Sequence, residues 1–239
     1  MSDNNQHKPE GHSMYKQLLF VIGASALLAA CSSTPEIQTG DDAEVIMGNL
    51  NKVDNSRADL AYMDPNADFS KYSKVMVMPL GVDNVEIIQP SKSKSVTGNQ
   101  NWELTEEDKD KLRKTFHEAM VKNLQDKGDY PLVTEPGDDV LQIAASLTAI
   151  APAAAKDDNR SRATGRSRVY SEGAGALAVM VAFGDSETGE VLGIMKDSKS
   201  SSAIWGNNNS VSNMADVRHM FNGWALQIRN GLDNLHGKK

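Results

Sequence analysis

The feature that most limits what this chain can fold into is an apolar run near its start that ends in the only cysteine. Leu18 to Ala30 read LLFVIGASALLAA, and Cys31 follows directly. The run is shorter than the ~20 apolar residues that a membrane-spanning helix requires. It follows Lys16 and closes on small residues, which is the pattern of a secretory signal peptide. Residues 1–30 are therefore expected to be removed and to contribute nothing to the fold.

The end of this run also indicates where the mature chain begins. Leu28-Ala29-Ala30-Cys31 resembles the lipobox of bacterial lipoproteins. The resemblance implies that a peptidase cuts before Cys31, after the sulfur has received a diacylglyceryl group. A thiol is needed there because the thiolate is the nucleophile that takes the lipid. Two or three acyl chains would hold the protein at a membrane, whereas one chain binds only marginally.

Two further residues refine this assignment. In the sorting rule of two-membrane bacteria, aspartate after the lipidated cysteine retains a lipoprotein at the inner membrane. Ser32 therefore implies the outer membrane, with the protein on its periplasmic face. Met14 resembles a more typical start than Met1, so residues 1–13 are either an extended leader or a misplaced start. The alternative for Cys31 is a free thiol in an uncleaved anchor or a buried helix.

The balance of charges excludes some partners. The chain carries 25 Lys and Arg against 32 Asp and Glu, a formal charge of −7, and the charges before Cys31 cancel. Such an acidic chain lacks the basic footprint that nucleic-acid phosphates need, so no nucleic-acid partner is expected. Acylation of Cys31 would leave no thiol for a disulfide, even in an oxidising periplasm. The roughly 209 remaining residues must fold around an apolar core, and they suffice for one domain.

Composition predicts three regions along the chain: a lipoprotein signal peptide at 1–30, a lipid-anchored flexible tether at 31–68, and a periplasmic α+β domain at 69–239. The tether is inferred because Pro, Gly, Asn and Asp are frequent there and apolar residues are scattered. Fully extended, it would reach on the order of 120 Å. The domain would then not need to sit on the membrane.

Apolar patterns predict the strands of this domain. Residues 75–78 form a continuous apolar run closed by Pro79, as in a strand buried on both faces. In residues 139–150 apolar and polar side chains alternate, as in a strand with one wetter face. Gly189 suits the positive φ of a turn between two further strands. The expected strands are 75–78, 130–133, 139–150, 174–184 and 190–197, with 200–205 extending the last one or forming an edge.

Two helices complete the expected domain. Thr105 and Asp108 form the pattern of a capping box at the start of the first helix, and Gly128 is expected to end it in the left-handed conformation. Its buried face is predicted to contain Leu112, Phe116, Met120 and Leu124. The second helix starts at Ser212, and its apolar stripe contains Met214, Val217, Phe221, Trp224, Ile228, Leu232 and Leu235. Together, the patterns predict a single α+β domain with two main helices packed against a mostly antiparallel sheet.

Several segments together resemble one known family. In order, ADFSKYSKVMVMPL, KGDYPLV, EPGDDVLQIAASLTAI and FGDSETGEVLG are similar to the bacterial lipoprotein family catalogued as domain of unknown function 3313. The most telling motifs are PG-x-DVL, here Pro136 to Leu141, and D-x-x-TGEVL, which starts at Asp185. That family has no established activity. The resemblance implies an envelope lipoprotein and supplies no catalytic residue.

Motifs for catalysis or metal binding are not found in the sequence. His117 and His219 belong to no H-x-H or H-E-x-x-H pattern, so they are expected to be solvated or capping residues. Asp185, Glu187 and Glu190 crowd one turn without the twelve-residue calcium loop, and a solvated turn is expected. No G-x-S-x-G nucleophile motif occurs, and the Ser and Lys residues of SKSKS, residues 91–95, lie in a low-complexity stretch where a flexible linker is expected. We therefore expect no catalytic residue, no metal ligand and no cofactor.

One basic cluster stands out in this acidic chain: Arg160, Arg162, Arg166 and Arg168, in a long loop after Pro152. Guanidinium groups bind phosphates and carboxylates in a bidentate way. The cluster is therefore a candidate contact for anionic lipid head groups, lipopolysaccharide phosphates or the carboxylates of wall peptides. The alternative is a solvated charged loop.

These observations favour a non-catalytic binding or assembly module. It would be anchored in a membrane by lipid on Cys31 and would contact an envelope protein or the cell wall. Two alternatives remain at this point. One is an envelope enzyme, such as a hydrolase whose site is not visible in the sequence, and the other is a purely structural lipoprotein.

Overall fold

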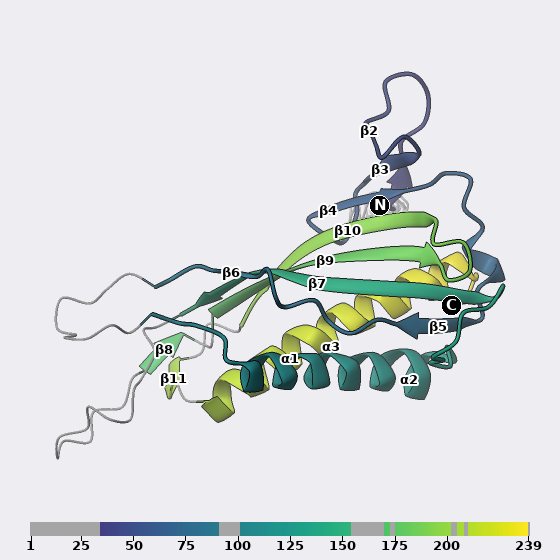
Figure 1. The fold of residues 1–239 in the computed structure, drawn as a ribbon. Helices are drawn as coiled ribbons and strands as arrows, with labels where there is room; N and C mark the ends of the chain where they lie inside the picture. Colours follow the sequence, from purple (N-terminus) through teal and green to yellow (C-terminus); the bar gives the residue numbers. More distant parts are fainter. Residues whose placement is uncertain are drawn as a thin grey trace, which may run out of the picture. The chain divides into compact units, whose positions relative to one another are not determined.

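The computed structural model describes residues 34–90, 101–153, 170–172, 175–201, 205–207 and 210–238. From Pro35 onward the chain forms one compact unit. The unit is α+β, as predicted, with two long helices on one face of a mostly antiparallel sheet (Figure 1). In this part of the chain, no helix combines the length and apolar character needed to cross a membrane.

The chain contains eleven described strands and two long helices. The strands are β1 (Glu36–Ile37), β2 (Val45–Ile46), β3 (Leu50–Asp54), β4 (Leu60–Met63), β5 (Lys74–Val77), β6 (Glu86–Ile87), β7 (Val140–Pro152), β8 (Tyr170–Glu172), β9 (Gly175–Asp185), β10 (Val191–Ser200) and β11 (Trp205–Asn207). The helices are η1 (Phe69–Lys71), α1 (Glu106–Met120), η2 (Val121–Gln125), which is a π-helix, α2 (Asp126–Gly128) and α3 (Ser210–Leu235).

Nine of these strands form one sheet in the order β1-β3-β4-β10-β9-β7-β5, with β2 paired to β3 and β6 paired to β7. All pairs are antiparallel except β5 and β6, which run parallel to β7. The outer edge of β5 is partly covered, because the Val75 N–H donates to the Pro131 carbonyl at 3.0 Å and the Val133 N–H donates to the Val75 carbonyl at 2.9 Å. The predicted strand at 130–133 is thus reduced to a single bridge between Leu132 and Val75.

Strands β1 to β4, which lie between residues 36 and 63, belong to the sheet. This corrects the expected tether over 31–68 and moves the start of the folded part from residue 69 to Pro35. Strand β4 pairs with β10 from Leu60 to Met63, and β3 pairs with β4 on its other side. The segment resembles a linker in composition because its strands are short and lie toward one edge. Such strands bury few side chains, so their apolar residues are scattered among polar ones.

The three central strands β7, β9 and β10 match the sequence prediction closely. In β7, Leu141, Ile143, Ala145 and Leu147 are buried. The alternation ends at a register shift between Leu147 and Ala149. Ala149 therefore lies opposite Ala178, on the other face from the predicted one. The turn between β9 and β10 contains Gly189 at φ 72°, as predicted.

Helix α1 begins as expected and ends differently. The Asp108 N–H donates to Thr105 Oγ1 and the Thr105 N–H donates to Asp108 Oδ2, both at 3.1 Å, which completes the predicted capping box. All four predicted apolar residues of this helical segment are buried. The left-handed residue at its end is Asp129, at φ 55°, and not Gly128. Gly128 is needed for close packing instead, because a Cβ there would lie 2.8 Å from the Asn123 carbonyl oxygen.

Helix α3 supplies much of the core. Phe221, Trp224, Ile228 and Leu232 are buried as predicted, whereas Leu235 is 42% exposed, so the stripe ends before the helix does. The helix also starts at Ser210, two residues before the predicted cap. The rings of Phe116 and Phe221 meet edge to face at 5.5 Å. This contact joins α1 and α3, which lie side by side beneath the sheet (Figure 1).

Candidate functional site

The residues that the sequence singles out for anchoring and partner contact lie outside the described residues. They are Cys31, Arg160, Arg162, Arg166 and Arg168. Their roles stay predictions. His117 and His219 are both exposed, on α1 and α3. Within the described residues, no group of three or more His, Cys, Asp or Glu is arranged to hold a metal ion.

The most elaborate polar centre in the described residues surrounds Asp185, at the turn between β9 and β10. Asp185 is 6% exposed. Its Oδ1 accepts the backbone N–H groups of Glu187 and Thr188, both at 3.0 Å. Its Oδ2 accepts a hydrogen bond from Lys71 Nζ at 2.9 Å and another from the Tyr72 hydroxyl at 2.8 Å. The carboxylate thus joins this turn to the end of η1, more than a hundred residues earlier in the chain.

These donors hold Asp185 in its charged form. The Thr188 backbone N–H, followed by Lys71, lowers the pKa of Asp185 well below its usual range. The same contact with Asp185 raises the pKa of Lys71. Burial, together with Asp185, raises the pKa of Tyr72. A carboxylate with such a low pKa is a poor general base near neutral pH, so the centre is suited to holding the fold rather than to acid–base chemistry.

The expectation of a solvated turn is therefore wrong for Asp185, although Glu187 and Glu190 are exposed as expected. Asp followed by Thr-Gly three residues later is the signature of a side chain that bonds to backbone N–H groups of its own turn. That signal was present in the sequence. The partners Lys71 and Tyr72 were not predictable, because only the tertiary fold brings η1 to the turn.

The other motif that carries the family resemblance, PG-x-DVL at residues 136–141, lies directly against this turn. Ser186 Oγ accepts the Gly137 N–H and donates to the Gly137 carbonyl, both at 3.0 Å. Asp139 accepts a hydrogen bond from Ser73 Oγ at 2.6 Å and pairs with Lys74 Nζ at 3.0 Å. The Ser73 hydroxyl and then Lys74 lower the pKa of Asp139. Both motifs thus form one structural junction at the end of the sheet.

A buried carboxylate on β10 holds helix α3 against the sheet. Asp197 is 5% exposed, and its Oδ2 accepts a hydrogen bond from Trp224 Nε1 at 2.8 Å. The same oxygen pairs with Lys199 Nζ at 3.1 Å, and Oδ1 accepts the Asp59 N–H at 3.2 Å. All these partners belong to the chain itself. Like Asp185, Asp197 is engaged in structural bonds.

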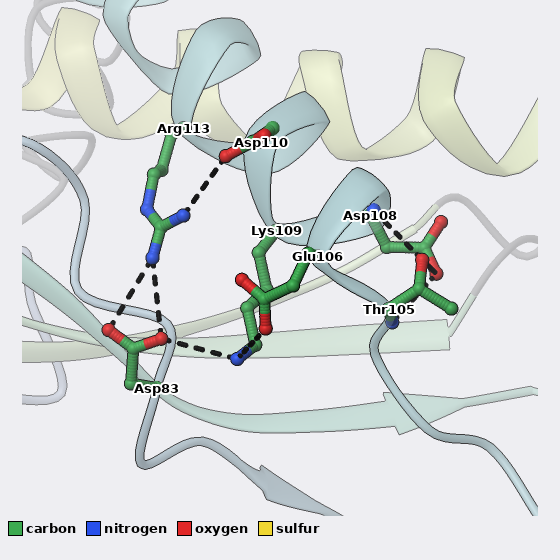
Figure 2. Close-up of polar contacts among 7 residues, drawn as sticks. All are labelled: Asp83, Thr105, Glu106, Asp108, Lys109, Asp110 and Arg113. Atoms are coloured by element: carbon green, nitrogen blue, oxygen red, sulfur yellow. Dashed lines mark hydrogen bonds and ion pairs between the residues drawn. The ribbon is translucent and has the colours of Figure 1, made fainter.

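Charged side chains also cluster at the start of α1, where Figure 2 shows Asp83 between two cations. Lys109 Nζ lies 3.3 Å from Asp83 and 2.7 Å from Glu106, and Arg113 lies 3.3 Å from Asp83 and 3.1 Å from Asp110. Each cation is matched by two carboxylates. Ion pairs near the surface contribute little to stability, because solvent screens them. The cluster attaches the loop at Asp83 to α1 and does not offer unmatched positive charge.

The family model of DUF3313, described as a protein of unknown function, matches residues 48–228. The chain belongs to this family. The matched region of DUF3313 runs from just before β3 to the buried part of α3, and it contains both motifs of the structural junction. No curated protein matches the sequence.

Solved structures with a similar course of chain come from several bacteria. A DUF330 protein from Xanthomonas campestris is 10% identical at a TM-score of 0.39, over 70% of this chain and 87% of that one. A candidate lipoprotein from Caulobacter crescentus is 9% identical at a TM-score of 0.32, over 72% and 95%. PelC from Paraburkholderia phytofirmans, a dodecamer, is 7% identical at a TM-score of 0.35, over 71% and 96%.

Proposed function

We propose that this protein is a lipid-anchored lipoprotein of the bacterial cell envelope that works as a non-catalytic binding or assembly module. The observation that carries the proposal is the lipobox-like LAAC sequence ending at Cys31, directly before the compact unit that starts at Pro35. The proposed location is the periplasmic face of the outer membrane. The proposed partner is another envelope component, such as the cell wall.

The bonding of the buried carboxylates supports a non-catalytic role. Asp185 and Asp197 are the titratable groups with the most internal partners among those described above, and each is occupied by donors of the fold itself. A general acid or base must instead reach a substrate and exchange a proton with it.

Acylation of Cys31 is the first prediction to test. The full chain, expressed in a two-membrane bacterium and labelled with an alkyne fatty acid, is expected to incorporate the label. Cys31→Ser is expected to lose it, because no other thiol exists in the chain. Mass spectrometry should find a mature N-terminus at acylated Cys31. Ser32→Asp is the matched control: it should keep the label but fractionate with the inner membrane. An unlabelled wild type with a free Cys31 thiol would contradict the proposal.

The four arginines are the predicted partner contact. In a Cys31→Ser background, changing Arg160, Arg162, Arg166 and Arg168 to Gln is expected to reduce co-sedimentation with purified wall sacculi about 10-fold, because the positive charges that would bind the wall carboxylates are removed. The measurement is made at low salt, because salt screens contacts between charges. A double change of Lys109 and Arg113 to Gln is the control, since these cations are already paired within the chain. If the arginine variant and the control sediment equally with the sacculi, the four arginines do not contribute to wall binding.

A further inference from the structure

The folded unit begins very close to the proposed lipid. Five residues of chain lead from Cys31 to Glu36, where β1 starts. At no more than ~3.6 Å per residue, they span at most about 18 Å. If Cys31 is acylated, as the proposed function requires, the edge of the sheet that contains β1 is held at the membrane surface. The long tether expected from composition would have allowed any face of the domain to turn toward the membrane.

Exposed apolar side chains lie on this same edge. Strands β1 and β2 both pair with β3, through Ile37 with Val53 and Ile46 with Leu50. The β2–β3 hairpin, residues 45–54, exposes 67% of Met47 and 46% of Val45. Met47 has the largest exposed fraction of the exposed large hydrophobic side chains in the described part of the chain.

The backbone at Met47 indicates that this side chain does not serve the fold. Its φ is 52°, and Gly48 follows at φ 86°. The left-handed region is favoured by glycine and asparagine and disfavoured for a long side chain with a Cβ. Strained residues of this kind cluster where function requires them. Here the strained turn presents a flexible, apolar side chain to solvent. The turn is on the same edge of the sheet as β1, at the Leu50 end of β3, whereas Glu36 pairs with Asp54 at the other end.

The charges of the segment favour one kind of surface. Glu36, Asp41 and Asp42 are exposed, while Glu44 is paired with Lys52 at 2.7 Å. Unpaired acidic groups are repelled by anionic lipid. We propose that the β2–β3 hairpin is a membrane-contact surface, and that Val45 and Met47 insert among the head groups of zwitterionic phospholipids when the chain is anchored through Cys31.

The test uses the full lipidated chain, with acylation verified by mass spectrometry before reconstitution into phosphatidylethanolamine–phosphatidylcholine vesicles. Acylated Cys31 leaves no thiol, so Met47→Cys gives a single site for an environment-sensitive dye. The control is Glu118→Cys, an exposed position on α1. Brominated lipids are expected to quench the dye at position 47 at least about 3-fold more than at position 118, because an interfacial side chain lies within reach of the acyl boundary. Adding phosphatidylglycerol should reduce the difference in quenching between positions 47 and 118, because this anionic lipid repels the acidic groups near the hairpin.

A second arm separates membrane contact from folding. With the dye on Val45→Cys, Met47→Asn is expected to reduce quenching about 2-fold while the melting temperature stays the same or rises, since asparagine tolerates the left-handed region. Equal quenching at positions 47 and 118 in an acylated protein overturns the hairpin contact and leaves the proposed anchoring intact. A mass spectrum without an acyl group overturns both.

Discussion

Replacing Trp224 by alanine is expected to lower the free energy of unfolding by about 4 kcal/mol. Trp224 is 1% exposed, and its ring lies 6.0 Å from that of Phe221. The substitution leaves a large cavity between α3 and the sheet. It also removes the indole N–H that donates a hydrogen bond to Asp197. Urea unfolding of the Cys31→Ser chain, followed by far-ultraviolet circular dichroism, measures the loss.

Two variants separate the contributions at this position. Trp224→Phe keeps most of the ring but removes the indole N–H, and is expected to cost about 1–2 kcal/mol. Leu226→Ala on the same helix is the matched control, because Leu226 is 39% exposed and its loss should cost under about 0.5 kcal/mol. If Trp224→Ala and Leu226→Ala lower stability equally, α3 is not held to the sheet as described.

Replacing Asp185 by asparagine is expected to lower the free energy of unfolding by about 3 kcal/mol at neutral pH. The asparagine oxygen can still accept the turn N–H groups, but its amide group would face the donors of Lys71 and Tyr72. Lys71 is half exposed, so solvent screening limits its share of the loss. Glu187→Gln in the same turn is the control. The Glu187 side chain is exposed, so this change should alter the free energy of unfolding very little.

The same centre predicts a pH dependence of stability. The pKa of Asp185 is lowered in the folded protein from an ordinary value of 3.8. Its contribution is therefore fully present at neutral pH and is lost as the pH falls below about 4, toward the folded-state pKa. The difference in unfolding free energy between wild type and Asp185→Asn should narrow over that range. A difference that stays constant from pH 7 to pH 3 would contradict the charged carboxylate.

Periodic patterns predicted the elements that bury a full face. The stripe of α3, the capping box of α1 and the long strands β7, β9 and β10 follow from residue spacing, because each contributes several apolar side chains to one core. In these elements the errors fall at the ends: at Leu235, at Gly128 and at the register shift after Leu147. End positions depend on tertiary packing, which local spacing does not contain.

Short edge elements and buried polar centres were not predictable in the same way. Strands β1 to β3 are short and pair with one another, and β4 pairs with the distant β10. Backbone hydrogen bonds hold these strands, so their residues need not be apolar or periodic. The role of Asp185 depends on η1, and that of Asp197 depends on α3. The proposed anchoring residue Cys31 is the opposite case, because the lipobox resemblance is a local pattern that requires no fold.

The partly covered edge of β5 would have a consequence for this protein if it is confined to a membrane surface, as the proposed anchoring through Cys31 requires. Molecules restricted to two dimensions meet one another far more often than in bulk solution, and an open strand would invite them to join sheet to sheet. Here the backbone of Val75 is already satisfied by Pro131 and Val133, and the opposite edge consists of the very short strands β1 and β2. Crowding can therefore increase without strand-by-strand polymerisation.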